Sequence, residues 1–118
     1  MNLGTRYLGL NLRNPVVASA GPLSQTVDGV RALASAGVGA VVMYSLFEEQ
    51  VRRELERDAA LEEAHEESFA EALSYFPAVA TPTERGVADT YVDLVRRAAA
   101  AVDVPVIASI NGASLGGW

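Results

Sequence analysis

Residues 16–44 read VVASAGPLSQTVDGVRALASAGVGAVVMY, and this stretch decides the fold class. It opens with a short apolar run at 16–20 and closes with another at 40–44, and runs of this length are typical of buried strands. Between them, Ser24-Gln25-Thr26 can cap a helix at about 26–36. The apolar residues of that helix recur on one face: Val27, Val30, Leu33 and Ala34. The order strand, helix, strand predicts a parallel pair with a right-handed crossover.

The same pattern recurs toward the C-terminus. Apolar residues stand at helical spacing over 87–102, and a third apolar run follows at about 105–110, opened by a proline. Repeated alternation of strand and helix predicts an α/β protein with a parallel sheet. The strands start at about 16, 40 and 104, so the two units between them span about 24 and 64 residues, and against the ~30 residues of a TIM (β/α)8 barrel unit the second would carry an insertion. Residues 1–118 would then be the N-terminal portion of such a barrel, with about three parallel strands. The sequence therefore predicts one domain that continues beyond this stretch.

Two further segments flank this repeat. Thr5–Tyr7 and Leu10–Leu12 alternate about Gly9 and predict a short hairpin ahead of the first strand. Between the second strand and the second helix, residues at about 48–76 are rich in Ala, Glu, Leu and Arg, which favour a helix. We interpret this segment as an acidic helical insertion in the barrel.

Composition excludes several classes of chemistry. Half of the 118 residues are hydrophobic and there is no cysteine, so neither a thiol nucleophile nor a cysteine-ligated metal is available. All nine cationic side chains are arginine, which excludes Schiff-base and P-loop lysine chemistry within the chain. No apolar run is long enough for a membrane span, and the start does not resemble a signal peptide. We expect a cytoplasmic protein.

Negative charge is concentrated in one part of the chain. Residues 48–71 carry ten acids against three arginines, a net charge of −7, whereas the rest of the chain is about +1. An acidic block without a basic stripe argues against nucleic acid and anionic membranes as partners. His65 lies within this block, but a single histidine among glutamates is more typical of a solvated helix face than of a metal site. No metal is expected.

Each predicted strand ends in small or polar residues, at the edge where α/β proteins bind ligands. The three ends are Ser19-Ala20-Gly21, Ser45, and Ser109-Ile110-Asn111-Gly112. Ser109 and Asn111 share one face of their strand by the period of two. Small residues let a flat ligand approach the backbone, and serine and asparagine supply hydrogen bonds. The alternative is that such residues simply end strands.

Three segments carry a resemblance to a known family. Tyr7-Leu8-Gly9-Leu10-Asn11-Leu12-Arg13-Asn14-Pro15-Val16-Val17-Ala18-Ser19-Ala20-Gly21 resembles the opening of the dihydroorotate dehydrogenase family. Leu73-Ser74-Tyr75-Phe76-Pro77 and Pro105-Val106-Ile107-Ala108-Ser109-Ile110-Asn111-Gly112 are similar to its dihydroorotate dehydrogenase-like branch. The resemblance implies a TIM barrel that binds FMN and belongs to pyrimidine biosynthesis.

Several residues take an expected role from this resemblance. It implies contacts with FMN for Ser19, Ala20, Gly21, Ser45, Ser109 and Asn111. Tyr44 stands where the family has a lysine near flavin and substrate, and Tyr75 and Phe76 are candidates for a substrate-loop wall or a packing anchor. The family's catalytic base and phosphate-binding glycines come from later strands. The resemblance therefore places the base beyond Trp118, and no catalytic residue is assigned within residues 1–118.

The resulting hypothesis is an FMN-dependent oxidoreductase that acts on a small carbonyl-bearing, dihydroorotate-like substrate, with a homo-oligomer left open. One alternative is a phosphate-binding TIM barrel without flavin. The other is an inert barrel that acts as an interaction module through its acidic insertion.

Overall fold

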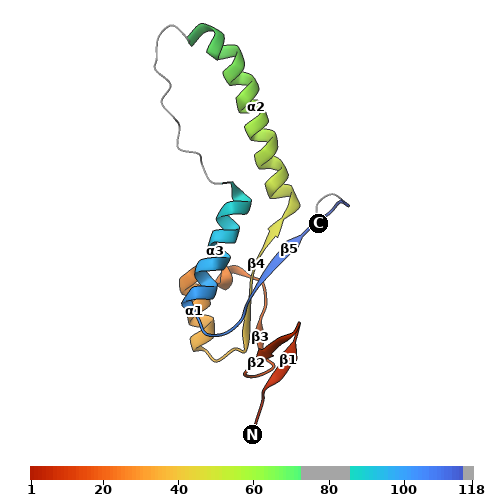
Figure 1. Cartoon of the computed structure of the whole chain (residues 1–118), viewed down its shortest axis with the longest axis vertical. Coiled ribbons are helices and arrows are strands. Elements are labelled where there is room, and N and C mark those ends of the chain that lie inside the picture. Colours follow the sequence, from red (N-terminus) through yellow and green to blue (C-terminus); the bar gives the residue numbers. More distant parts are fainter. Residues whose placement is uncertain (73–85, 116–118) are drawn as a thin grey trace.

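The computed structural model describes residues 1–72 and 86–115, with the side chains of the first range described to residue 64. Residues 73–85 lie outside this range, and with them Tyr75 and Phe76, the candidates for a substrate-loop wall or a packing anchor. The described chain is elongated because one long helix projects from a small α/β body, as Figure 1 shows. No helix within it combines the length and apolar character needed to cross a bilayer.

The predicted hairpin is confirmed. Strands β1 (Thr5–Tyr7) and β2 (Leu10–Leu12) pair antiparallel, with Tyr7 opposite Leu10. The two turn residues have positive φ, 49° at Leu8 and 77° at Gly9, which is the conformation that tight hairpin turns require. The hairpin buries Leu12 at its inner end.

The predicted parallel sheet is also confirmed. Strands β3 (Val17–Ala18), β4 (Ala40–Phe47) and β5 (Val106–Asn111) lie in that order and pair in parallel. β3 is shorter than the predicted 16–20, and β4 continues beyond the predicted 40–44 because Leu46 is buried against the core. The sheet does not close on itself, so the chain is α/β with three parallel strands, and the barrel stays a prediction.

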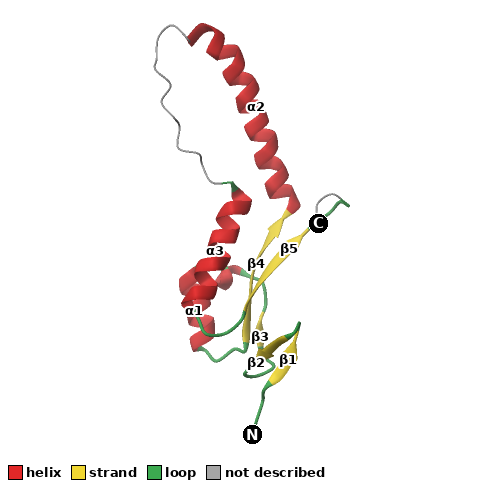
Figure 2. Cartoon of the chain, viewed as in Figure 1, coloured by secondary structure: helices red, strands yellow, loops and turns green. Residues whose placement is uncertain are grey.

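Two helices cover one face of this sheet (Figure 2). Helix α1 (Val27–Ser35) follows a single 3-10 turn, η1 (Pro22–Ser24), and begins at Thr26, whose Oγ1 accepts the Gly29 N–H at 3.0 Å. Helix α3 (Val87–Ala101) is the second. These bounds confirm the predicted helices and the predicted cap.

The hairpin is fastened to the C-terminal end of α1. The Arg13 guanidinium donates to the carbonyls of Ala34, at 2.7 Å, and Val38, at 2.9 Å. A cation at the C-terminal end of a helix complements its dipole, and here it donates to the last-turn carbonyl of Ala34 and to Val38 in the loop beyond the helix. The next residue, Asn14, donates from its side chain to the Gly37 carbonyl at 2.7 Å.

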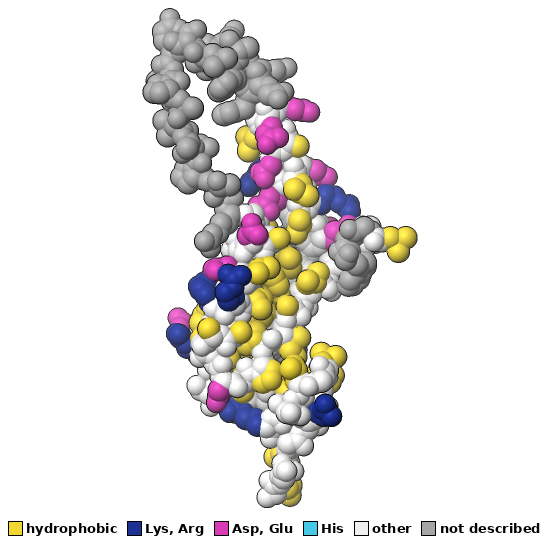
Figure 3. Space-filling view, viewed as in Figure 1, with side chains coloured by type: hydrophobic (Ala, Val, Ile, Leu, Met, Phe, Trp, Pro, Cys, Tyr) yellow, Lys and Arg dark blue, Asp and Glu magenta, His cyan; other side chains and the backbone are white. Residues whose placement is uncertain are grey.

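The hydrophobic core lies between the sheet and the two helices. Its buried members are Val30, Val41, Met43, Leu46, Tyr91, Ala98 and Val104. The alternating residues of β4 and β5, among them Val42 and Ile107, face away from this core, and no described helix covers them. Figure 3 shows apolar side chains gathered over the body of the molecule below the long helix.

That long helix is α2 (Glu48–Ala72), which begins at the residue after β4 ends. It confirms the helical character of the predicted insertion up to residue 72, and residues 73–76 lie outside the described range. Only its first two turns are tied to the body by side-chain hydrogen bonds among the described residues, through Glu48, Gln50 and Glu54.

Candidate functional site

An irregularity in the pairing of β4 with β5 brings two predicted site residues together. Val42 lies opposite Ile107, but the next partners are Ser45 and Ser109, so β4 holds one extra residue between these pairs. This is the geometry of a β-bulge. Ser45 and Ser109 are both half-buried, and their hydroxyl oxygens are 2.7 Å apart, a hydrogen-bond distance. The pair lies on the sheet face that no described helix covers.

The Tyr91 hydroxyl occupies the gap that this bulge opens. It accepts the Ser109 N–H at 2.9 Å and lies 2.8 Å from the Tyr44 carbonyl oxygen and 3.0 Å from the Ser109 carbonyl oxygen. Burial raises the pKa of Tyr91, while the hydrogen bond with the Ser109 backbone acts in the opposite direction. The phenol therefore stays protonated at neutral pH and can donate to either carbonyl.

Tyr44 is not placed beside the serine pair. Its ring packs edge-on against the Tyr91 ring, with centroids 5.2 Å apart and an interplanar angle of 80°. Aromatic pairs favour this arrangement. The Tyr44 side chain is half-buried next to the core, on the side of α3. Its predicted role as a substrate residue is therefore not supported by contact with Ser45 or Ser109.

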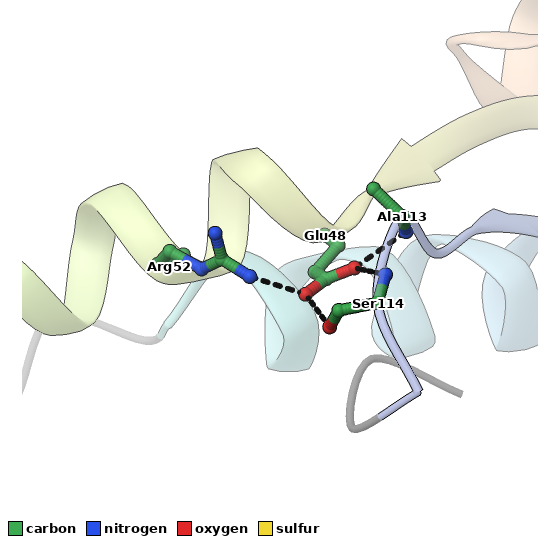
Figure 4. A network of polar contacts seen from close by, with 4 residues as sticks. All are labelled: Glu48, Arg52, Ala113 and Ser114. Atoms are coloured by element: carbon green, nitrogen blue, oxygen red, sulfur yellow. Dashed lines mark hydrogen bonds and ion pairs between the residues drawn. The ribbon is translucent and has the colours of Figure 1, made fainter.

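Asn111 is the last residue of β5, and the loop after it is held by Glu48. The Glu48 carboxylate accepts the N–H groups of Ala113, at 2.5 Å, and Ser114, at 2.9 Å, together with the Ser114 hydroxyl at 2.5 Å (Figure 4). Arg52 donates to the same carboxylate at 2.5 Å. We refer to these four residues as the Glu48 clamp.

The clamp changes the acidity of Glu48. Hydrogen bonds from the Ser114 hydroxyl and from the backbone of Ala113 and Ser114 lower the pKa of Glu48 from 4.5 to about 2, with a smaller contribution from the charge of Arg52. The Glu48 side chain is only 11% exposed. Because these donors bind the charged carboxylate, the clamp is closed at neutral pH.

A cavity of about 490 Å³ lies beside the clamp. Its apolar wall consists of Leu46, Phe47, Val51, Leu55 and Ile110. Leu46 pairs with Ile110 in the sheet, one position beyond the Ser45–Ser109 pair, so both lie on the opposite face from the two hydroxyls. Neither Ser45 nor Ser109 lines this cavity, so the cavity and the hydroxyl pair are separate features near the same end of the sheet.

The remaining predicted residues lie at the end of β3. Ser19 and Ala20 are exposed, and the Gly21 carbonyl accepts both the N–H and the hydroxyl of Ser24 at 3.1 Å. Within the described chain, none of the residues 19–21 hydrogen-bonds to Ser45, Ser109 or Asn111. The structure thus brings together Ser45 and Ser109, sets Asn111 on the same face of β5, and leaves the first strand end apart.

The catalytic base expected beyond Trp118 is not tested by these contacts. The described part of the chain ends at residue 115, so Trp118 itself lies outside it. The position of the base stays a prediction from the family resemblance.

Metal ligation gains no support from the described residues, in which no three His, Cys, Asp or Glu side chains cluster. The His65 side chain lies outside the side chains described. Neither the role of the Tyr91 hydroxyl nor that of Glu48 was predicted from the sequence. One signal was present for Tyr91: a tyrosine on an apolar helix face usually needs a hydrogen-bond partner when it is buried.

Comparison of the chain with protein-family models, with curated proteins and with solved structures gave no match.

Proposed function

We propose that this chain supplies the opening strands of an FMN-binding (β/α)8 barrel that resembles the dihydroorotate dehydrogenase family. The observation that carries the proposal is the Ser45–Ser109 hydroxyl pair near the C-terminal ends of adjacent parallel strands, on the uncovered face of the sheet. In a barrel this face would be the lumen, and ligands bind at the C-terminal ends of its strands. The preceding hairpin and the strand order match the same architecture.

The residues of β4 and β5 fit the ring of a flavin better than its phosphate. Hydroxyl groups can donate or accept, so Ser45 and Ser109 can follow the alternating donors and acceptors along a flavin ring edge. The Asn111 side chain, on the same face, adds an amide. Neither strand contains a cationic residue, so a countercharge for the phosphate must come from elsewhere in the protein.

FMN would supply the hydride-accepting or hydride-donating centre, and this chain's residues would position its ring. Ser45 and Ser109 hydrogen-bond to each other, which leaves one hydroxyl proton and free lone pairs on the pair for a ligand. Neither strand carries a group that takes up a proton near neutral pH. The base that moves the substrate proton must therefore lie on another segment.

The test is flavin binding by the whole polypeptide encoded by the reading frame that contains these residues. We expect a yellow protein that releases FMN on denaturation. Ser45→Ala and Ser109→Ala should each weaken FMN affinity up to about tenfold, because one hydrogen bond contributes about 0.5–1.5 kcal/mol. Ser35→Ala, at an exposed serine of α1, is the matched control and should leave affinity unchanged.

A colourless protein that does not bind added FMN would overturn the proposal. Binding of inorganic phosphate by such a colourless protein would favour a phosphate-binding barrel without flavin. Retention of FMN with unchanged affinity in both alanine variants would show that the flavin lies elsewhere in the molecule.

A further inference from the structure

We propose that Tyr91 is a positioning residue of this site. Its hydroxyl lies between β4 and β5 and holds the bulge in β4. Because of this bulge, the side chain on the same face as Ser109 is that of Ser45 and not that of Tyr44. The inference deepens the proposed function and rests on it where flavin binding is concerned. It concerns a residue on a helix that lies behind the sheet and does not itself reach the uncovered face.

The pairing register shows what the bulge changes. Val42 and Ile107 are partners before it, so an uninterrupted ladder would pair Tyr44 with Ser109 and Ser45 with Ile110. A shift of one residue moves every following side chain of a strand to the opposite face. Without the bulge, Tyr44 would lie on the uncovered face and Ser45 would point toward the helices.

The contacts of the Tyr91 hydroxyl explain how the bulge is held. A bulge leaves backbone groups without their usual ladder partners, and buried groups of this kind need hydrogen bonds. The Tyr91 hydroxyl accepts the N–H of Ser109 and reaches the carbonyl of Tyr44, which are groups from the two separated strands. Tyr91 is only 2% exposed, so water does not readily replace its hydroxyl.

The Tyr91 ring also helps to determine that Ser45, and not Tyr44, lies on the uncovered face of the sheet. Its edge-on contact with the Tyr44 ring, at 5.2 Å between centroids, retains Tyr44 on the helix side of the sheet. The hydroxyl and the ring of Tyr91 therefore both favour the register in which Tyr44 lies on the helix side and Ser45 on the uncovered face. The uncovered face then presents two small hydroxyls and has room for the edge of a flat ring, whereas the alternative register would place a phenol there.

Tyr91→Phe tests this inference because it keeps the ring contact and removes the hydroxyl alone. Tyr7→Phe is the matched control, because it removes the phenolic hydroxyl of an exposed tyrosine in the hairpin, outside the parallel sheet. The whole polypeptide is used, with two readouts. NMR reports the proximity of the Ser45 and Ser109 side chains and the exchange rate of the Ser109 amide, and a titration reports FMN affinity.

We expect Tyr91→Phe to lose the Ser45–Ser109 proximity, to speed Ser109 amide exchange about tenfold or more, and to weaken FMN binding about tenfold. Tyr7→Phe should change neither readout. If Tyr91→Phe keeps the serine pair and binds FMN within about twofold of the parent, the inference is wrong. If the parent does not bind FMN, the proposed function fails, while the NMR readout still decides the role of Tyr91.

A third variant covers the case in which Tyr91→Phe does not fold. Replacing Tyr91 by 4-aminophenylalanine keeps, at the same ring position, a donor for the Tyr44 carbonyl and a weaker acceptor for the Ser109 N–H. This variant should retain the Ser45–Ser109 proximity and, in a flavin-binding parent, FMN affinity within about threefold. A folded 4-aminophenylalanine protein that has lost the serine pair would contradict the inference.

Discussion

Removal of the Glu54 carboxylate should destabilise the protein through helix α3, thirty-three residues away. The N-terminal residue of α3, Val87, donates its N–H to Glu54 Oε2 at 2.7 Å, whereas the N-cap residue Gly86 supplies no side-chain hydrogen bond. Glu54 on α2 thus performs the task of an N-cap from another helix. Loss of a cap costs about 0.5–2 kcal/mol, and a negative charge at a helix N-terminus contributes about 0.3–1 kcal/mol.

We therefore expect Glu54→Ala to lower the free energy of unfolding by about 1–2 kcal/mol. Glu54→Gln keeps an acceptor and loses only the charge, so it should cost about 0.3–1 kcal/mol. Urea unfolding followed by far-UV circular dichroism measures both. Glu56→Ala, an exposed site on the same helix, is the control. Equal stabilities of the two alanine variants, within about 0.3 kcal/mol, would refute the reasoning, because that difference is below the smallest cap contribution.

Three further predictions address the fold, the clamp and the hydroxyl pair. Gly39→Ala should cost about 1–3 kcal/mol in a thermal melt, because its Cβ would overlap the Asn14 carbonyl oxygen, and an unchanged melting temperature would contradict this contact. The pKa of Glu48 is lowered, so the stabilisation by its clamp is complete above about pH 4.5 and is lost as pH falls toward about 2. The difference in unfolding free energy between the parent and Glu48→Gln must shrink over that range, and a constant difference would show that the carboxylate charge is not responsible. A double-mutant cycle on Ser45 and Ser109 should give a coupling of about 0.5–1.5 kcal/mol, and a value near zero would mean that their hydrogen bond does not form in solution.

The spacing of apolar residues predicted the helices and strands well because it depends directly on which side chains are buried. The hairpin bounds at Thr5–Tyr7 and Leu10–Leu12 agree with the structure, as do the three parallel strands and the Thr26 cap of α1. Each of these rests on neighbours in the sequence, where alternation, helical spacing and turn residues leave a visible pattern. The extension of β4 to Phe47 was missed because Ser45 resembles a strand end, although Leu46 beyond it is buried.

The contacts that shape the site leave no such pattern. Tyr91 meets Ser109 across 18 residues, Glu54 meets Val87 across 33, and Glu48 meets Ser114 across 66. Each joins a side chain to the backbone of a different element, and the partner could be any residue there. The bulge also leaves no pattern in the sequence, because one extra residue in an apolar strand does not change the apolar character of that strand. Sequence could therefore nominate Ser45 and Ser109, but not show that they meet.

The direct passage from β4 into α2 also has a mechanical consequence. The Phe47 N–H donates to the Gln50 side chain at 3.1 Å, which stiffens a junction that has no linker residue. At 1.5 Å per residue the helix is about 37 Å long, so a tilt of about 5° at its base moves its far end by about 3 Å. The same rigid junction also transmits force from the helix back to the strand. A load applied to the outer turns of α2 exerts a torque on the end of β4, two residues from Ser45, and so on the spacing of the two strands.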